Sequence, residues 1–84
     1  METPAWLNKA NVKVTLDARP ILASGQHPLE RVISEASSLN EGEIYEIVTP
    51  FPPLPMIEKL NALGFESHSE MEETGLYHTY FLKS

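Results

Sequence analysis

Cysteine is absent from this sequence of 84 residues, and basic residues are scarce, with six Lys and Arg against twelve Asp and Glu. Without cysteine the chain can form no disulfide, thiolate metal site, thiol nucleophile or persulfide carrier. The few basic residues form no cluster, which argues against nucleic-acid binding because that binding relies on cations that neutralise phosphates. Apolar runs fall far short of the roughly 20 residues of a membrane span, and no secretory signal opens the chain. We therefore expect a cytoplasmic protein that binds neither nucleic acid nor membrane.

The negative charge is concentrated in the second half of the chain. Residues 1–40 are balanced, whereas residues 41–84 carry eight glutamates against two lysines and hold the whole net charge of −6. A solvated acidic surface that maintains solubility is the simplest interpretation. The length and the 42% hydrophobic content predict a single domain at 12–84, preceded by a tail at 1–11. In the tail, Trp6 and Leu7 either pack on an exposed sheet face or contact a partner.

Hydrophobic periodicity predicts the element order β-α-β-α-β-β. Strands are expected at 12–17, 43–49, 65–71 and 76–83, helices at 28–39 and 54–63, and loops at 20–27 and 50–55. The helix at 54–63 is expected to bury Leu54, Ile57, Leu60 and Leu63 and to end at a left-handed Gly64. The second strand is expected inside the sheet, and the polar third strand at an edge. These elements predict an α/β (α+β) two-layer sandwich, with a four-stranded mixed sheet and both helices on one face.

The proline-rich segment 50–55 is expected to be a stiff connection from strand to helix. A polyproline ligand for an aromatic-lined groove is the alternative interpretation. Candidate residues for binding a ligand or partner lie near this segment, at the carboxyl ends of the first two strands. They are Asp17, Arg19, His27, Pro28, Thr49 and Phe51.

Helix amino ends meet strand carboxyl ends at this edge, where Arg19 and His27 would favour an anion or a carboxylate. A salt bridge between Asp17 and Arg19 with a purely structural role is the alternative. If Asp17 instead orients His27 as an acid–base group, this edge would belong to a small enzyme or enzyme subunit.

His68 and His78 form a second candidate site. If the last hairpin turns near residues 73–74, the two histidines lie nearly opposite each other, with Glu66 or Glu70 nearby. A zinc site needs three or four ligands, so we expect solvated histidines and no metal. The chain contains no glycine-rich phosphate loop and no Gly-x-Ser-x-Gly elbow, and no cofactor is expected.

Several short motifs, taken in order, resemble those of the TusA/SirA-like group. They are LDAR at 16–19, Pro28 before the first helix, GE at 42–43 and LGF at 63–65. The chain most closely resembles a family of unknown function within that group, whose members carry a proline-rich loop similar to VTPFPPLP at 48–55. The resemblance covers about residues 14–83 and implies the two-layer fold already predicted.

In the sulfur-carrier branch of this group, a Cys-Pro-x-Pro motif precedes the first helix. Here Gly25 stands at the cysteine position, so the resemblance does not imply persulfide transfer. It implies partners associated with hemerythrin-like or cupin domains, or with nitrogen-oxide metabolism. The same topology occurs in an RNA-binding domain of a translation initiation factor, a role that the acidity argues against. We expect a non-enzymatic interaction module whose partner is a protein or a small anionic ligand.

Overall fold

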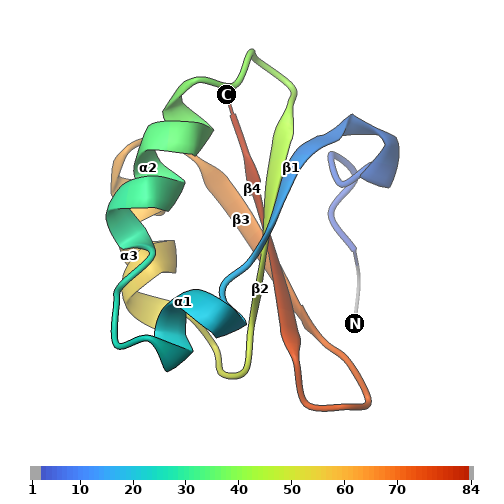
Figure 1. The fold of residues 1–84 in the computed structure, drawn as a ribbon. Helices are drawn as coiled ribbons and strands as arrows, with labels where there is room; N and C mark the ends of the chain where they lie inside the picture. The colour runs from blue at the N-terminus through green and yellow to red at the C-terminus, as the bar shows by residue number, and fades with distance from the viewer. Residues whose placement is uncertain (1–2, 84) are drawn as a thin grey trace.

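The computed structural model describes residues 3–83, which contain four strands, three α-helices and one short 3₁₀ helix (Figure 1). In chain order they are η1 (Lys9–Asn11), β1 (Val12–Asp17), α1 (Arg19–Ala23), α2 (Leu29–Ser37), β2 (Ile44–Thr49), α3 (Leu54–Ala62), β3 (Glu66–Met71) and β4 (Tyr77–Leu82). No helix in this part of the chain has the length and apolar content needed to cross a membrane. The ends of the predicted tail and domain, at Met1, Glu2 and Ser84, lie outside the described residues.

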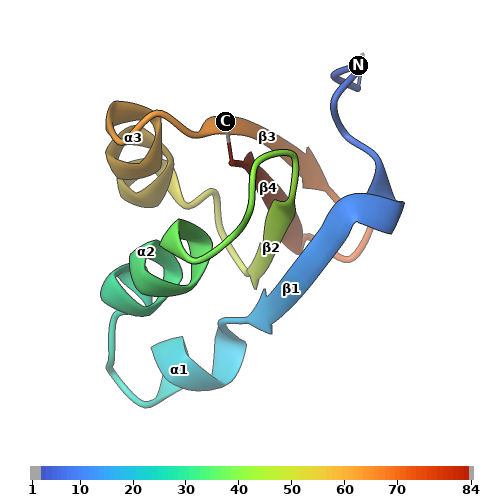
Figure 2. The same ribbon diagram turned by 90° about the horizontal axis from the view of Figure 1, so that it is seen from above.

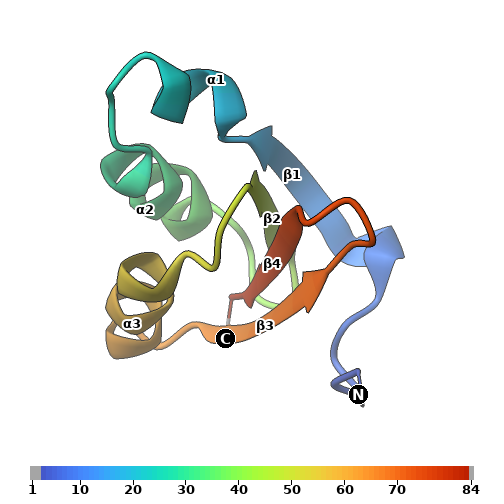
Figure 3. The same ribbon diagram turned by 90° about the horizontal axis from the view of Figure 1, so that it is seen from below.

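The four strands form one mixed sheet in the order β1-β2-β4-β3. β1 and β2 run parallel, whereas β4 is antiparallel to both β2 and β3. All three α-helices cover the same face of this sheet (Figures 2 and 3). The predicted two-layer sandwich is therefore confirmed, as are the inner position of the second strand and the edge position of the third.

Burial along the strands follows from their places in the sheet. In β1, Leu16 points to the core while Lys13 and Thr15 are exposed, as the alternation of a strand predicts. β2 is buried along nearly its whole length because it has a neighbouring strand on each side. The core itself lies between the sheet and the helices. Its buried members are Leu16, Ala18, Val32, Ala36, Leu39, Tyr45, Ile47, Met56, Leu60, Phe65 and Phe81.

Helix α3 turns a different face to the core from the one predicted. Leu54 and Leu63, which were expected to be buried, are 61% and 50% exposed. The stripe that faces the core consists of Pro53, Met56, Ile57 and Leu60, at spacing i, i+3, i+4 and i+7. The prediction omitted Pro53 and Met56, because the leucines alone also fit a helical period.

The segment predicted as a loop at 20–27 includes most of the short helix α1, which begins at Arg19. Pro20 lies in its first turn, where a missing N–H costs nothing and the fixed φ suits a helix. The side chain of Asp17 accepts a hydrogen bond from the Arg19 N–H at 3.0 Å, just ahead of this turn. A helix of five residues is too short to show a hydrophobic period, so the proline was interpreted only as the end of the strand.

The amino-terminal tail lies on the side of the sheet away from the α-helices (Figures 1 and 2). It contains η1, in which the Ala10 N–H donates to the side chain of Asn8 at 3.0 Å. Trp6 and Leu7 are half-buried. The tail therefore has local structure that its sequence did not predict.

Candidate functional site

A groove of about 320 Å³ lies between the start of α2 and the loop that joins β2 to α3. It is lined by four prolines (Pro28, Pro52, Pro53, Pro55), by Leu22, Leu29, Phe51 and Met56, and by the polar residues His27 and Thr49. We refer to it as the proline groove. The structure thus brings together four of the six predicted site residues, namely His27, Pro28, Thr49 and Phe51.

Prolines fix the backbone on both sides of the proline groove. Pro28 is buried at the start of α2, where its carbonyl accepts a hydrogen bond from the Val32 N–H at 2.9 Å. Pro53 is buried at the start of α3, and its carbonyl accepts from the Ile57 N–H at 3.0 Å. Because proline has little φ freedom, these walls have little conformational entropy to lose when a ligand binds.

The proline groove offers few polar atoms. The buried hydroxyl of Thr49 is already used, since it donates to the carbonyl oxygen of Phe51 at 2.6 Å. His27 is exposed, and its imidazole makes no hydrogen bond or ion pair with any residue from 3 to 83. Of these two polar side chains, His27 is therefore the one available to meet a ligand.

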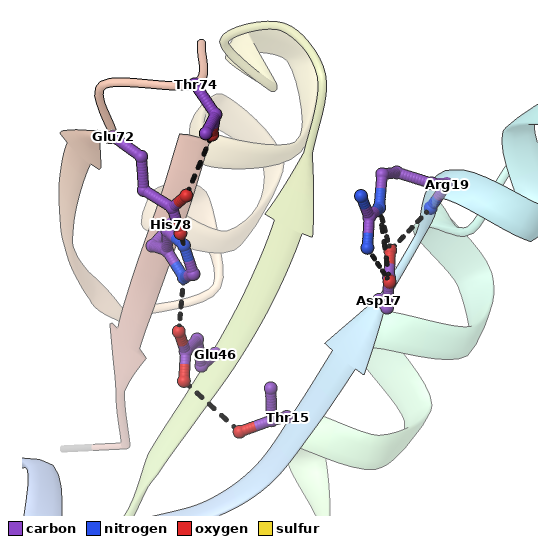
Figure 4. A network of polar contacts seen from close by, with 7 residues as sticks. All are labelled: Thr15, Asp17, Arg19, Glu46, Glu72, Thr74 and His78. Atoms are coloured by element: carbon purple, nitrogen blue, oxygen red, sulfur yellow. Dashed lines mark hydrogen bonds and ion pairs between the residues drawn. The ribbon is translucent and has the colours of Figure 1, made fainter. Parts of the chain in front are cut away.

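Asp17 and Arg19 lie outside this lining and pair with each other (Figure 4). The Arg19 Nη2 is 2.6 Å from Asp17 Oδ2, and its Nε is 2.9 Å from Oδ1. Hydrogen bonds from the Arg19 side chain and then from its backbone N–H lower the pKa of Asp17 to about 2. Asp17 is thus engaged by Arg19, and within the described residues no hydrogen bond connects it to His27.

Strand alternation explains why the predicted site is divided. Asp17 is in register with Val48 of the neighbouring strand, so both side chains point to the same face of the sheet. Thr49, one residue further on, points to the opposite face, where the helices lie. The ends of β1 and β2 lie at one edge of the sheet, as predicted, but the side chains of Asp17 and Thr49 point to opposite faces.

A larger cavity, of about 690 Å³, is lined by side chains on the face of the sheet away from the α-helices. We refer to it as the open-face cavity. It is lined by Lys9, Val12 and Thr15 from the start of the chain, by Glu46 from β2, and by His68, Glu70, Met71, Glu72, His78 and Tyr80 from the last hairpin. Its lining is far more polar than that of the proline groove.

A hydrogen-bonded network crosses the open-face cavity (Figure 4). The Thr15 hydroxyl donates to Glu46 Oε1 at 3.1 Å, and Glu46 Oε2 lies 2.6 Å from His78 Nδ1. On the other side of the imidazole, Nε2 contacts Glu72 Oε1, while the Thr74 hydroxyl donates to Glu72 Oε2 at 2.9 Å. The network connects β1, β2, β4 and the turn between β3 and β4.

Burial and hydrogen bonding act in opposite directions on His78. Burial lowers its pKa, but the hydrogen bonds to Glu46 and Glu72 outweigh burial, so the pKa of His78 rises above its ordinary value of 6.5. The hydrogen bond from His78 is the chief cause of a lowered pKa for Glu72. Burial, followed by the charges of Glu46 and Glu70, raises the pKa of Tyr80 to about 12. Neighbouring carboxylates thus raise the pKa values of His78 and Tyr80, whereas the pKa of Glu72 is lowered because His78 and Thr74 donate hydrogen bonds to it.

His68 and His78 are diagonal neighbours across the last hairpin. Glu70 is the residue in register with His78, and Tyr80 is in register with His68. Both nitrogens of His78 face carboxylates, and His68 Nε2 lies 3.4 Å from Glu70 Oε2. Within residues 3–83, no group of three or more His, Cys, Asp or Glu side chains is arranged to hold a metal ion.

The role of Glu46 and Glu72 as partners of His78 was missed by the sequence analysis. Glu46 and His78 are 32 residues apart in the chain. They meet because β2 pairs with β4 in a register that sets Val48 opposite His78, and Glu46 two residues away on the same face. Alternation alone shows that each side chain lies on one face of its own strand. Only the register between β2 and β4 shows that Glu46 and His78 lie next to each other.

The fold and the proline groove define a small α/β sandwich domain with a preformed apolar groove. The chain belongs to the family described as "Uncharacterized conserved protein (DUF2249)", which it matches over residues 15–83. The match runs from within β1 to just beyond β4, and it includes every residue that lines the proline groove. No curated protein and no solved structure matches the chain. The expected membership of a family of unknown function is thereby confirmed.

Proposed function

We propose that this protein is a non-enzymatic interaction module that accepts an apolar side chain of a partner protein in the proline groove. The observation that carries the proposal is the groove's lining, in which eight of ten residues are apolar and four of those are prolines. Its volume of about 320 Å³ is at the small end of the range for ligand sites. A groove of this size and polarity suits one or two side chains of a partner segment.

The rim of the proline groove adds two features that favour a protein partner. Phe51 is 44% exposed, and covering a large apolar side chain is favourable in proportion to the area removed from water. His27 can donate a hydrogen bond to a backbone carbonyl or to a carboxylate of the partner. The small anionic ligand expected from the sequence is less well supported, because the charge of Arg19 is already paired with Asp17.

The alternative function, a small enzyme that uses His27 as an acid–base group, lacks geometric support. General acid–base catalysis depends on a catalytic group held within hydrogen-bond reach of the atom it serves. His27 is exposed and has no orienting partner among residues 3–83, and Asp17 is occupied by Arg19. Binding therefore accounts for the site better than catalysis does.

The relationship to the TusA-like group remains part of the proposal. It is supported by the motifs at 16–19, 42–43 and 63–65 and by the order of strands and helices. With it we propose a cytoplasmic location and partners of the hemerythrin-like or cupin type, or from nitrogen-oxide metabolism. Persulfide transfer is not part of the proposal, since Gly25 stands where the sulfur carriers have cysteine.

A titration with N-acetyl-phenylalanine methylamide, followed by the amide NMR shifts of the labelled protein, tests the proposed function. We expect saturable shifts at Thr49, Phe51 and Met56 with millimolar affinity, while the amides around the open-face cavity remain in place. The same compound with a free carboxylate serves as a second probe. Tighter binding of the acid, lost in His27→Ala, would identify carboxylate recognition, and equal binding would identify a purely apolar contact.

Two variants with comparable exposure provide the control. Phe51→Ala removes a groove side chain that is 44% exposed, and we expect it to weaken binding of the amide several-fold. Leu63→Ala removes an apolar side chain that is 50% exposed but lies outside the groove, and we expect unchanged binding. If neither probe produces saturable shifts in the unmodified protein, the proposed function is wrong.

A further inference from the structure

His78 is held between two carboxylates that belong to different parts of the fold (Figure 4). Its Nδ1 lies 2.6 Å from Glu46 Oε2 on β2, and its Nε2 contacts Glu72 Oε1 in the turn between β3 and β4. The side chain of Glu46 is 16% exposed, whereas that of Glu72 is 40% exposed. His78 therefore connects an exposed turn to an inner strand of the sheet.

Two carboxylates can both accept hydrogen bonds from one imidazole only if the ring carries two N–H groups. A neutral imidazole has one N–H and one lone pair, and an ionised carboxylate can only accept. The observed arrangement is therefore that of an imidazolium. Loss of the proton leaves one ring nitrogen facing a carboxylate with no hydrogen between them.

We propose that His78 is a proton-controlled latch that holds the β3–β4 turn against the sheet when charged and releases it when neutral. Glu46 keeps its hydrogen bond in the neutral state, because it is the more sheltered carboxylate and is also held by the Thr15 hydroxyl at 3.1 Å. Glu72 is the contact that is lost, since its more exposed side chain can be hydrated instead.

The charged groups around His78 favour the closed latch. The charged and titratable groups that face His78 come from every neighbouring element. They are Lys9 from η1, Asp17 and Arg19 at the end of β1, Glu46 from β2, His68 and Glu70 from β3, Glu72 from the turn and Tyr80 from β4. Arg19 pairs with Asp17 and also attracts Glu72, so these two cations, Lys9 and Arg19, are outnumbered by four carboxylates. This excess of negative charge stabilises the imidazolium, in agreement with the raised pKa of His78.

The latch acts on the rim of the open-face cavity, which both Glu72 and His78 line. The turn itself is closed by two backbone hydrogen bonds, from the Glu72 N–H to the Leu76 carbonyl at 2.8 Å and from the Gly75 N–H to the Glu72 carbonyl at 2.9 Å. Once Glu72 is released, this exposed turn loses a side-chain tether to the sheet and opens more often. We therefore expect access to the cavity to increase as the pH rises.

Two NMR measurements on the intact chain test the latch. The first follows the imidazole signals of His78 with pH, and we expect a titration midpoint above 6.5. The second follows hydrogen exchange of the Glu72 and Gly75 amides, expressed as protection factors so that intrinsic base catalysis is removed. We expect protection to fall several-fold across the same midpoint, while amides in the middle of β2 remain protected.

Two neighbouring glutamates provide matched variants. Glu72→Gln removes the latch carboxylate, and we expect a lower His78 midpoint together with turn protection that no longer depends on pH. Glu73→Gln removes the same charge one residue away, at an exposed side chain with no partner among the described residues, and we expect neither change. The latch is excluded if the titration midpoint of His78 is at or below 6.5 or if the protection of the turn amides does not change across that midpoint. It is also excluded if both variants behave alike.

Discussion

At the scale of single residues, Tyr45 joins the sheet to helix α2 through its hydroxyl group. The side chain is buried, and its hydroxyl donates to Glu35 Oε1 at 2.5 Å. Burial, followed by this hydrogen bond, raises the pKa of Tyr45, while the same bond is the chief cause of a lowered pKa for Glu35. The pair thus remains a neutral donor and a charged acceptor at neutral pH.

We expect Tyr45→Phe to lower the free energy of unfolding by about 1–2 kcal/mol, because a hydrogen bond to a charged acceptor is lost. The loss is not larger because Glu35 can be hydrated and keeps its contact with Arg31 at 3.2 Å. Tyr77→Phe is the control, since the Tyr77 hydroxyl makes no hydrogen bond within the described residues, and its effect should stay within about 0.5 kcal/mol. Urea unfolding of both variants makes the comparison, and equal losses would contradict a stabilising role for the bond.

At the scale of elements, helix α3 ends at a glycine whose backbone conformation other residues rarely adopt. Gly64 has φ of +98°, and the Phe65 N–H donates back to the Leu60 carbonyl at 3.0 Å, as in a Schellman ending. This reversal directs Phe65 into the core, where it is buried. The sequence predicted a left-handed cap at this position, and the structure confirms it.

We expect Gly64→Ala to lower the free energy of unfolding by about 1 kcal/mol, the cost of a left-handed conformation for a residue with a Cβ. Crowding adds nothing, because no other atom lies within 4 Å of the position that the Cβ would take. Leu63→Ala, at an exposed neighbour with φ of −87°, should change stability much less. Urea midpoints of the two variants at constant pH provide the measurement. If the glycine variant is as stable as the unmodified protein, the cap does not constrain this helix.

At the scale of the whole molecule, two kinds of titrating group limit the pH range of greatest stability. The pKa values of Asp17, Glu35 and Glu72 are lowered in the folded state, so the stability that they add is lost as the pH falls towards those values. The pKa of His78 is raised, so its contribution is complete below about 6.5 and is lost as the pH rises through the folded value. The two effects leave an intermediate range in which all four contributions are present.

We therefore expect the free energy of unfolding to be greatest between about pH 4.5 and 6.5 and to decline on both sides. Urea unfolding at intervals from about pH 3 to 9 measures this profile. His78→Gln should flatten the decline on the alkaline side. On the acidic side it should remove only the contribution of Glu72, whose pKa His78 lowers, and leave those of Asp17 and Glu35. A stability that increases from pH 6.5 to 8.5 in the unmodified protein would contradict the assignment of His78.

Much of the fold was predictable because the strands and the two longer helices have strong local signals. The alternation in β1, the apolar stripe of α2 and the glycine at position 64 are each patterns of a few neighbouring residues. They can therefore be recognised in the sequence without knowing which segments pack together. The apolar character of the proline groove was not predicted, because the sequence analysis expected an anion-binding edge and the groove brings Pro28 to Phe51 from a distant part of the chain. Helix α1 was missed because five residues do not show a period.

From the amino-acid sequence alone follow the order of the four strands and the two longer helices, the edge position of the polar strand and the absence of thiol chemistry. Tertiary structure decided which face of α3 is buried, which of the predicted site residues share a groove, and that His78 lies between Glu46 and Glu72. The reason is that strand alternation assigns each side chain to a face only within its own strand. Which residues meet across strands depends on register, and the register is set by packing between segments that are distant in the chain.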